Sequence, residues 1–163
     1  MPRGQDVVAV LLKDHRTMED LFRQMRSVEA DRAGALKALA ALLVAHGQAE
    51  ESEVYPALKR FKKVDNDEVD QGVAEHAQGN EALLALLAVT EIGSQTWGEK
   101  LERLVEAVSR HVDEEERTIL NGARQNVPDA RRAELGQAFI RQREKYLAED
   151  CGNIDHVRRV VRH

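Results

Sequence analysis

The chain has 163 residues, of which 33% are charged, 4% are aromatic and only 3 are proline. This composition is typical of an all-α protein, and the length suits one hydrophobic core. The formal net charge of -5 disfavours a general role in binding nucleic acid or a membrane surface, and no apolar run approaches the roughly 18 residues of a membrane span.

Apolar residues recur at helical spacing in the first two segments. The first runs over residues 5–28, and His15 falls inside its apolar stripe. The second begins after Asp31, a residue type that favours the N-cap position. Pro56 should kink this second helix or end it near Tyr55, because proline lacks the N–H group that a helix needs.

Two further amphipathic segments follow after short polar loops. Residues 67–90 form the third, with His76 inside its stripe, and residues 95–122 form the fourth, with His111 interrupting its stripe. Ser94 is the expected N-cap of the fourth helix. Four long helices joined by short loops predict an up-down-up-down antiparallel four-helix bundle.

A fifth helix is predicted from Pro128 to about Glu149, followed by a short basic tail that can form one or two more helical turns. Its moderately apolar face should pack across the bundle or onto a second subunit. We therefore divide the chain into a bundle, residues 1–125, and a C-terminal helical extension, residues 126–163. The protein is expected to be a monomer, or a homodimer formed through this extension.

Two short motifs place a histidine and a glutamate on one helical face. They are His46 with Glu50 and His111 with Glu115, each spaced i and i+4, and in both a second glutamate follows directly. Residues spaced in this way lie one turn apart on the same side of a helix. An imidazole and a carboxylate arranged like this can bind one cation, or two neighbouring cations, without a loop.

Each of the four bundle helices carries a histidine near its middle, so these side chains should meet at one level of an antiparallel bundle. A single core histidine is more often structural than metal-binding. Two carboxylates buried together without partners would cost several kcal/mol each, however, and neutral imidazoles cannot offset that cost. We therefore predict a metal site, and ligation by nitrogen and oxygen without sulfur suits iron, manganese or zinc. The candidate ligands are His15, His46, Glu50, His76, His111 and Glu115.

With these motifs, the chain resembles the hemerythrin-like, or HHE cation-binding, domain over about residues 5–122. The resemblance implies a four-helix bundle with a non-haem centre of two iron ions, bridged by an oxo or hydroxo group. It also implies that both glutamates span the irons and that the four histidines are terminal ligands. Oxygen-carrying members have a second histidine one turn after the third-helix histidine, where this chain has Asn80. The resemblance thus implies an open position on one iron, with Asn80 beside it.

Small actinobacterial proteins of this type have a fifth helix, and family members show catalase-like activity. The resemblance implies a reaction with a small oxidant: O2, hydrogen peroxide or nitric oxide. The enzymatic alternative is removal of peroxide or nitric oxide, and the second alternative is O2 or iron binding, sensing or storage without turnover. A third alternative is an interaction bundle without metal.

Other reactive side chains are expected to be structural. Tyr55 and Tyr146 should pack at the ends of the bundle rather than approach the site. Cys151, the single cysteine, excludes an internal disulfide, favours a reducing cytoplasm and is expected to be a surface thiol.

Overall fold

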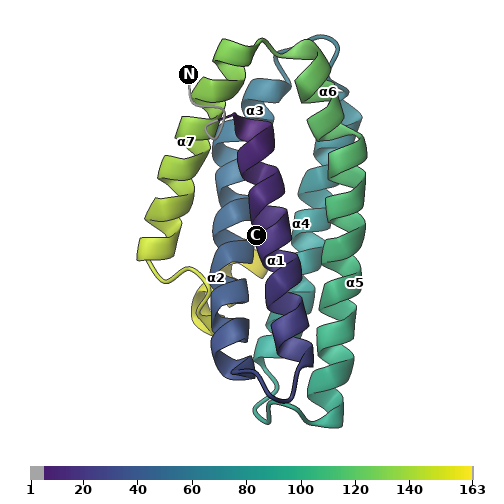
Figure 1. The fold of residues 1–163 in the computed structure, drawn as a ribbon, viewed down its shortest axis with the longest axis vertical. Coiled ribbons are helices and arrows are strands. Elements are labelled where there is room, and N and C mark those ends of the chain that lie inside the picture. Colours follow the sequence, from purple (N-terminus) through teal and green to yellow (C-terminus); the bar gives the residue numbers. More distant parts are fainter. Residues whose placement is uncertain (1–5, 163) are drawn as a thin grey trace.

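The computed structural model describes residues 6–162, and it contains four long helices that run alternately up and down (Figure 1). They are α1 (Val7–Arg26), α2 (Arg32–Ala49), α4 (Asn66–Leu87) and α5 (Gln95–Arg117). The predicted all-α fold, a four-helix bundle with additional C-terminal helices, is confirmed. The expected helix start at residue 5 lies outside the described residues.

Side-chain caps fix where these helices begin. The Asp31 carboxylate accepts a hydrogen bond from the Gly34 N–H at 2.9 Å, and the Ser94 hydroxyl accepts one from the Trp97 N–H at 3.2 Å. Both predicted N-caps are therefore confirmed. Gly93 precedes Ser94 with φ of +88°, a backbone conformation that favours glycine.

The second helix neither stops at Tyr55 nor continues as a regular α-helix. It widens into a π-helical segment, η2 (Glu50–Val54), and then continues as α3 (Tyr55–Leu58). Pro56 leaves the carbonyl one turn earlier without its N–H partner, and a π turn directly before it accommodates this loss. The widened turn contains Glu50, one of the predicted ligands.

The fourth helix was expected to be continuous to residue 122, and this was wrong. It breaks at Thr118, where φ is -109° and ψ is -77°, and resumes as α6 (Ile119–Asn126). The Thr118 hydroxyl donates to the Glu114 carbonyl at 2.6 Å. Hydroxyl bonds of this kind to the preceding turn tend to bend helices.

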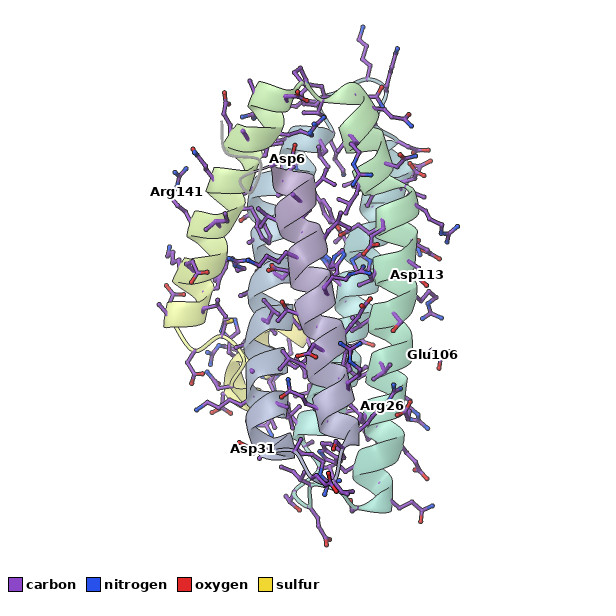
Figure 2. The ribbon with its side chains drawn as sticks, in the orientation of Figure 1. Asp6, Arg26, Asp31, Glu106, Asp113 and Arg141 are labelled. Atoms are coloured by element: carbon purple, nitrogen blue, oxygen red, sulfur yellow. The ribbon has the colours of Figure 1, made fainter. Side chains whose placement is uncertain are left out.

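The apolar core consists of two clusters separated along the bundle. One contains Met18, Leu39, Leu83 and Leu104 near the end that carries the α1–α2 loop, and the other surrounds Leu11 near the opposite end. The predicted ligands occupy the level between the two clusters. Charged side chains such as Glu106 and Asp113 project from the outer face of α5 (Figure 2).

The C-terminal extension packs on the bundle. Helix α7 (Asp129–Ala148) lies against α1 and α2, and α8 (Ile154–Val161) lies against α4 (Figure 1). Cys151, between them, is buried, and its thiol donates to the Ala41 carbonyl at 3.3 Å. The expectation of a surface thiol was therefore wrong. Burial also raises the pKa of this thiol to about 11.

None of the helices within residues 6–162 combines the length and the apolar character needed to cross a membrane.

Gly152 of the C-terminal extension lies close to the backbone of α2. A methyl group added at Gly152 would lie 2.4 Å from the Ala41 nitrogen and 2.7 Å from the Ala40 carbonyl carbon, and backbone atoms cannot rotate away. Gly152→Ala should therefore lower the free energy of unfolding by about 1–3 kcal/mol, measured by urea denaturation.

The matched control is Gly122→Ala in α6, where an added methyl group meets nothing within 4 Å. That substitution should raise the free energy of unfolding by about 0.5–1 kcal/mol, because alanine loses less backbone entropy in a helix. Equal effects of the two substitutions would contradict the packing of residues 151–152 against α2.

Candidate metal centre

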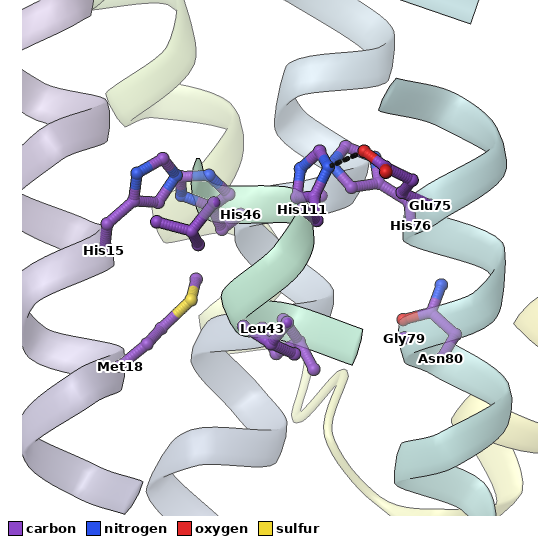
Figure 3. A pocket seen from close by; sticks show the side chains of 12 residues that line it. His15, Met18, Leu43, His46, Glu75, His76, Gly79, Asn80 and His111 are labelled. Carbon is purple, nitrogen blue, oxygen red and sulfur yellow. Dashed lines mark hydrogen bonds and ion pairs between the residues drawn. The ribbon is translucent and has the colours of Figure 1, made fainter. Parts of the chain in front are cut away.

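The six predicted ligands lie at one level in the middle of the bundle, and all are buried. Figure 3 shows the four imidazoles side by side at this level, each projecting from a different bundle helix. Glu50 and Glu115 have relative exposures of 0% and 1%, which is unusual for carboxylates without a strong partner.

Each glutamate lies between two imidazoles from different helices. One oxygen of Glu115 is 3.2 Å from Nε2 of His15, and its other oxygen is 3.2 Å from Nε2 of His111. Each carboxylate oxygen of Glu115 thus faces a different imidazole.

Glu50 has the equivalent position between the other two imidazoles. Its Oε1 is 3.1 Å from Nε2 of His46 and 3.0 Å from Nε2 of His76. The imidazoles thus present their Nε2 atoms to the interior of the layer.

These inward atoms are close to one another but are not aligned as hydrogen bonds. Among the described residues, the buried polar atoms without a hydrogen-bond partner include Nε2 of all four histidines, both oxygens of Glu50 and Oε1 of Glu115. Buried polar atoms are normally satisfied, so a concentration of unsatisfied atoms requires an explanation. Atoms that point to common centres rather than at one another are the arrangement that a bound cation requires.

The inward atoms form two groups, each compact enough for one metal ion. One group contains Glu50, His76, His111 and Glu115, and the other contains His15, His46 and Glu115, with the donor atoms of each group within 4.8 Å of one another. The shared Glu115 joins the two groups. The donor set of imidazoles and carboxylates fits iron, manganese or zinc.

An outer belt of carboxylates holds the other nitrogen of each imidazole. Each histidine donates through Nδ1 to a carboxylate on a neighbouring helix, at 2.8–2.9 Å. The pairs are His46 with Asp14, His76 with Glu51, His111 with Glu75, and His15 with Glu116. Followed around the bundle, α1 supplies a carboxylate to α2, the second helix to α4, α4 to α5, and α5 back to α1.

The belt follows a simple rule in the sequence. Each outer carboxylate directly precedes or follows an inner residue: Asp14 precedes His15, Glu51 follows Glu50, Glu75 precedes His76, and Glu116 follows Glu115. Adjacent helical residues point about 100° apart, so one faces the interior while its neighbour reaches the next helix. Sequence reasoning missed these four residues, although the doubled glutamates after both motifs were the available signal. Such outer partners fix the orientation of metal-binding histidines.

The carboxylates around the imidazoles outnumber the positively charged side chains that contact them. Six carboxylates contact the four imidazoles, and two arginines contact the belt: Arg16 at Glu116 and Arg143 at Asp14. With neutral imidazoles, four negative charges remain unbalanced. Two divalent cations supply the four positive charges that would balance them.

Protons on the imidazoles are the competing source of positive charge. Burial lowers the pKa of His15, but Glu115 and Glu116 on its two nitrogens outweigh burial and raise it to about 10. Burial and the carboxylates of Glu50 and Glu51 affect His76 in the same way, and its pKa is also raised to about 10. Metal binding must therefore release protons from these rings.

Tyr55 reaches the site, contrary to the expectation that it packs at the end of the bundle. Its hydroxyl donates to Glu115 Oε2, and its ring stacks on His76 with a centroid distance of 5.5 Å. Burial and the negative charge of Glu115 raise the pKa of Tyr55 well above its usual value, so the phenol retains its proton. In η2, the Tyr55 N–H bonds to the Glu50 carbonyl, and this wide turn brings the two residues to the same face. An α-helical periodicity could not predict that placement.

A small cavity lies on one side of the imidazole layer. Its volume is about 20 Å³, and Met18, Leu43, Val108 and Asn80 contribute to its walls together with the four histidines. Figure 3 shows Met18, Leu43 and Asn80 on the same side of the imidazoles. A volume of about 20 Å³ holds roughly one water-sized molecule. Asn80 also lines an open surface groove with Gln48 and Arg159, so it lies between this cavity and solvent.

Comparison with known proteins agrees with this geometry. The model of the hemerythrin HHE cation-binding domain matches residues 6–122. A hemerythrin HHE cation-binding domain-containing protein from Mycobacterium kansasii shares the fold, with a TM-score of 0.80, 24% identity, and coverage of 94% of this chain and 98% of that chain. A comparison with curated proteins found no match. The matched region contains all four helices that carry the imidazole layer, and the chain belongs to the hemerythrin HHE cation-binding domain family.

Proposed function

We propose that the protein is a non-haem di-iron protein that reacts with a small oxidant: O2, hydrogen peroxide or nitric oxide. The observation that carries this proposal is the buried layer of four imidazoles and two carboxylates whose inward atoms have no hydrogen-bond partners. The proposed ligands are His15 and His46 for one iron and His76 and His111 for the other. Glu50 and Glu115, each between two imidazoles, would contribute to both iron positions.

Iron bound in this layer would supply Lewis acidity and electrons to a small oxidant. The cavity beside the imidazoles restricts what can approach, because its walls are mostly apolar and its volume is about 20 Å³. A space of this size favours diatomic molecules and peroxide over larger organic substrates. The carboxamide of Asn80 offers an NH2 donor group and a carbonyl acceptor at the edge of the cavity.

Asn80 is the residue on which the reactive position depends. It lies one helical turn after His76, on the face of α4 that lines the cavity. An amide is a poor iron ligand, so the iron at His76 would retain an open position, and open positions distinguish reactive metal sites from closed ones. The alternative is reversible O2 binding, iron sensing or iron storage without turnover. Steady removal of peroxide or nitric oxide by the iron-loaded protein favours the first function, and a stable, reversible O2 adduct favours the second.

Removal of the metal should lower the melting temperature. A metal present at a thousand times its dissociation constant stabilises the native state by about 4 kcal/mol, which corresponds to roughly 10 °C for a chain of this size. Glu50→Gln removes one spanning carboxylate and keeps its shape, so much of this metal-dependent rise should be lost. Differential scanning calorimetry with and without iron measures both effects.

The matched control is Glu106→Gln, which removes the same charge from the exposed face of α5 (Figure 2). Its metal-dependent rise should equal that of the wild type. Identical melting curves for iron-loaded and metal-free wild-type protein would contradict a buried metal site.

Asn80→His should supply the missing ligand. The variant should retain two irons, bind azide more weakly than the wild type and shift from oxidant turnover towards reversible O2 binding. Spectrophotometric azide titration and the rate of peroxide loss measure the change, with iron content determined on the same samples.

Asn80→Ala is the control, because it removes the amide without adding a ligand. Azide affinity should remain at or above the wild-type value in this variant. If Asn80→His held both irons and kept wild-type azide affinity and turnover, the proposal of an open iron position beside His76 would be wrong.

A further inference from the structure

The belt link between Asp14 and His46 differs from the other three. Asp14 is buried, with a side-chain exposure of 7%, and Arg143 of α7 donates to its Oδ1 at 2.6 Å while His46 donates to its Oδ2 at 2.8 Å. Both carboxylate oxygens are therefore occupied by a charged or polar donor. Glu51 at His76 is 39% exposed, and Glu75 at His111 adjoins another carboxyl group, Glu114. Glu116 at His15 also contacts an arginine, Arg16, but this pair is far more exposed and Arg16 lies on a bundle helix.

Helix α7 contacts His46 at a second point. Phe139 lies one turn before Arg143, is fully buried, and meets the His46 ring edge-on at a centroid distance of 5.2 Å. The Arg143 guanidinium lies over the same phenyl ring at 5.6 Å. The extension thus contacts the His46 ring directly through Phe139 and indirectly through Arg143 and Asp14.

We infer that Arg143 is a positioning residue of the metal centre, which makes the metal position at His15 and His46 differ from the one at His76 and His111. This inference rests on the proposed di-iron site. A carboxylate on the far nitrogen of a metal-binding histidine fixes the ring orientation and its basicity. Arg143 holds that carboxylate in place, so the metal affinity of this position depends on a helix outside the bundle.

Through Arg143, a residue outside the matched domain contributes to the proposed metal centre. The match to the family model ends at residue 122, and Arg143 lies beyond the matched region. Helix α7 is thus more than a cover on α1 and α2, because it holds an outer partner of one metal ligand. All four belt carboxylates lie on the bundle helices, but the arginine that contacts Asp14 comes from α7, whereas the arginine that contacts Glu116, Arg16, belongs to α1.

The test compares Arg143→Met with Arg141→Met in the full chain. Arg141 is an exposed arginine on the same helix that points away from the bundle (Figure 2), so it controls for charge and for helix stability.

Metal-free protein is titrated anaerobically with Fe(II) against a chromogenic chelator, which yields the two affinities. Loss of an outer partner typically costs tenfold to a hundredfold in affinity. We expect one of the two irons in Arg143→Met to bind about tenfold to a hundredfold more weakly, with the other within threefold of its wild-type affinity and both unchanged in Arg141→Met.

A double-mutant cycle separates positioning from general destabilisation. If Arg143 acts through Asp14, Arg143→Met should have no further effect on iron affinity in an Asp14→Asn background. Equal losses in both backgrounds, equal weakening of both irons, or unchanged affinities in Arg143→Met would each overturn the inference and leave the di-iron proposal intact. Binding of a single iron by the wild type would overturn both.

Discussion

Four carboxylates and four imidazoles are buried at one level between two apolar clusters, and the helices around them have to accommodate their charge. An unpaired buried carboxylate is costly, and removing one partner of a buried pair leaves its charge exposed to a low-dielectric interior. The belt meets part of this cost, because every imidazole uses its Nδ1 to bind a carboxylate from a neighbouring helix. The inward atoms remain unsatisfied. The fold therefore holds an outer ring of hydrogen-bonded carboxylates around an inner set of unsatisfied atoms that bound cations would complete.

Much of this could be predicted from the sequence because the inner residues follow helical periodicity. Histidine in an apolar stripe, with glutamate one turn later, stands out against the leucine and valine expected there. The bundle topology followed from four amphipathic segments and short loops. Capping residues such as Asp31 and Ser94 set two of the helix starts correctly.

The remaining features depend on departures from that periodicity or on contacts distant in the sequence. Tyr55 reaches Glu115 through a π turn, which rotates the chain relative to an α-helix. The helix break at Thr118 could not be predicted because neither that residue nor its direct neighbours are proline or glycine. Arg143 is 129 residues from Asp14, so no local pattern connects them. The belt carboxylates were visible as neighbours of the inner residues, but acidic residues on helices are too common for adjacency alone to assign them.

The two sides of the imidazole layer are chemically different, and this difference connects the fold to the proposed reaction. The cavity with Asn80 opens towards one apolar cluster, whereas the hydroxyl of Tyr55 binds Glu115 within the layer. The extension adds a second difference, because α7 supports His46. A site of this kind would present its open position on one side only, at the iron beside His76.

Anomalous diffraction from crystals of the iron-loaded protein, collected at the iron absorption edge, would locate the metal ions. We expect two peaks about 3.5 Å apart inside the imidazole layer, with Glu50 and Glu115 each contacting both. One peak should adjoin His15 and His46 and the other His76 and His111. A single peak, or iron bound outside this layer, would contradict this expectation.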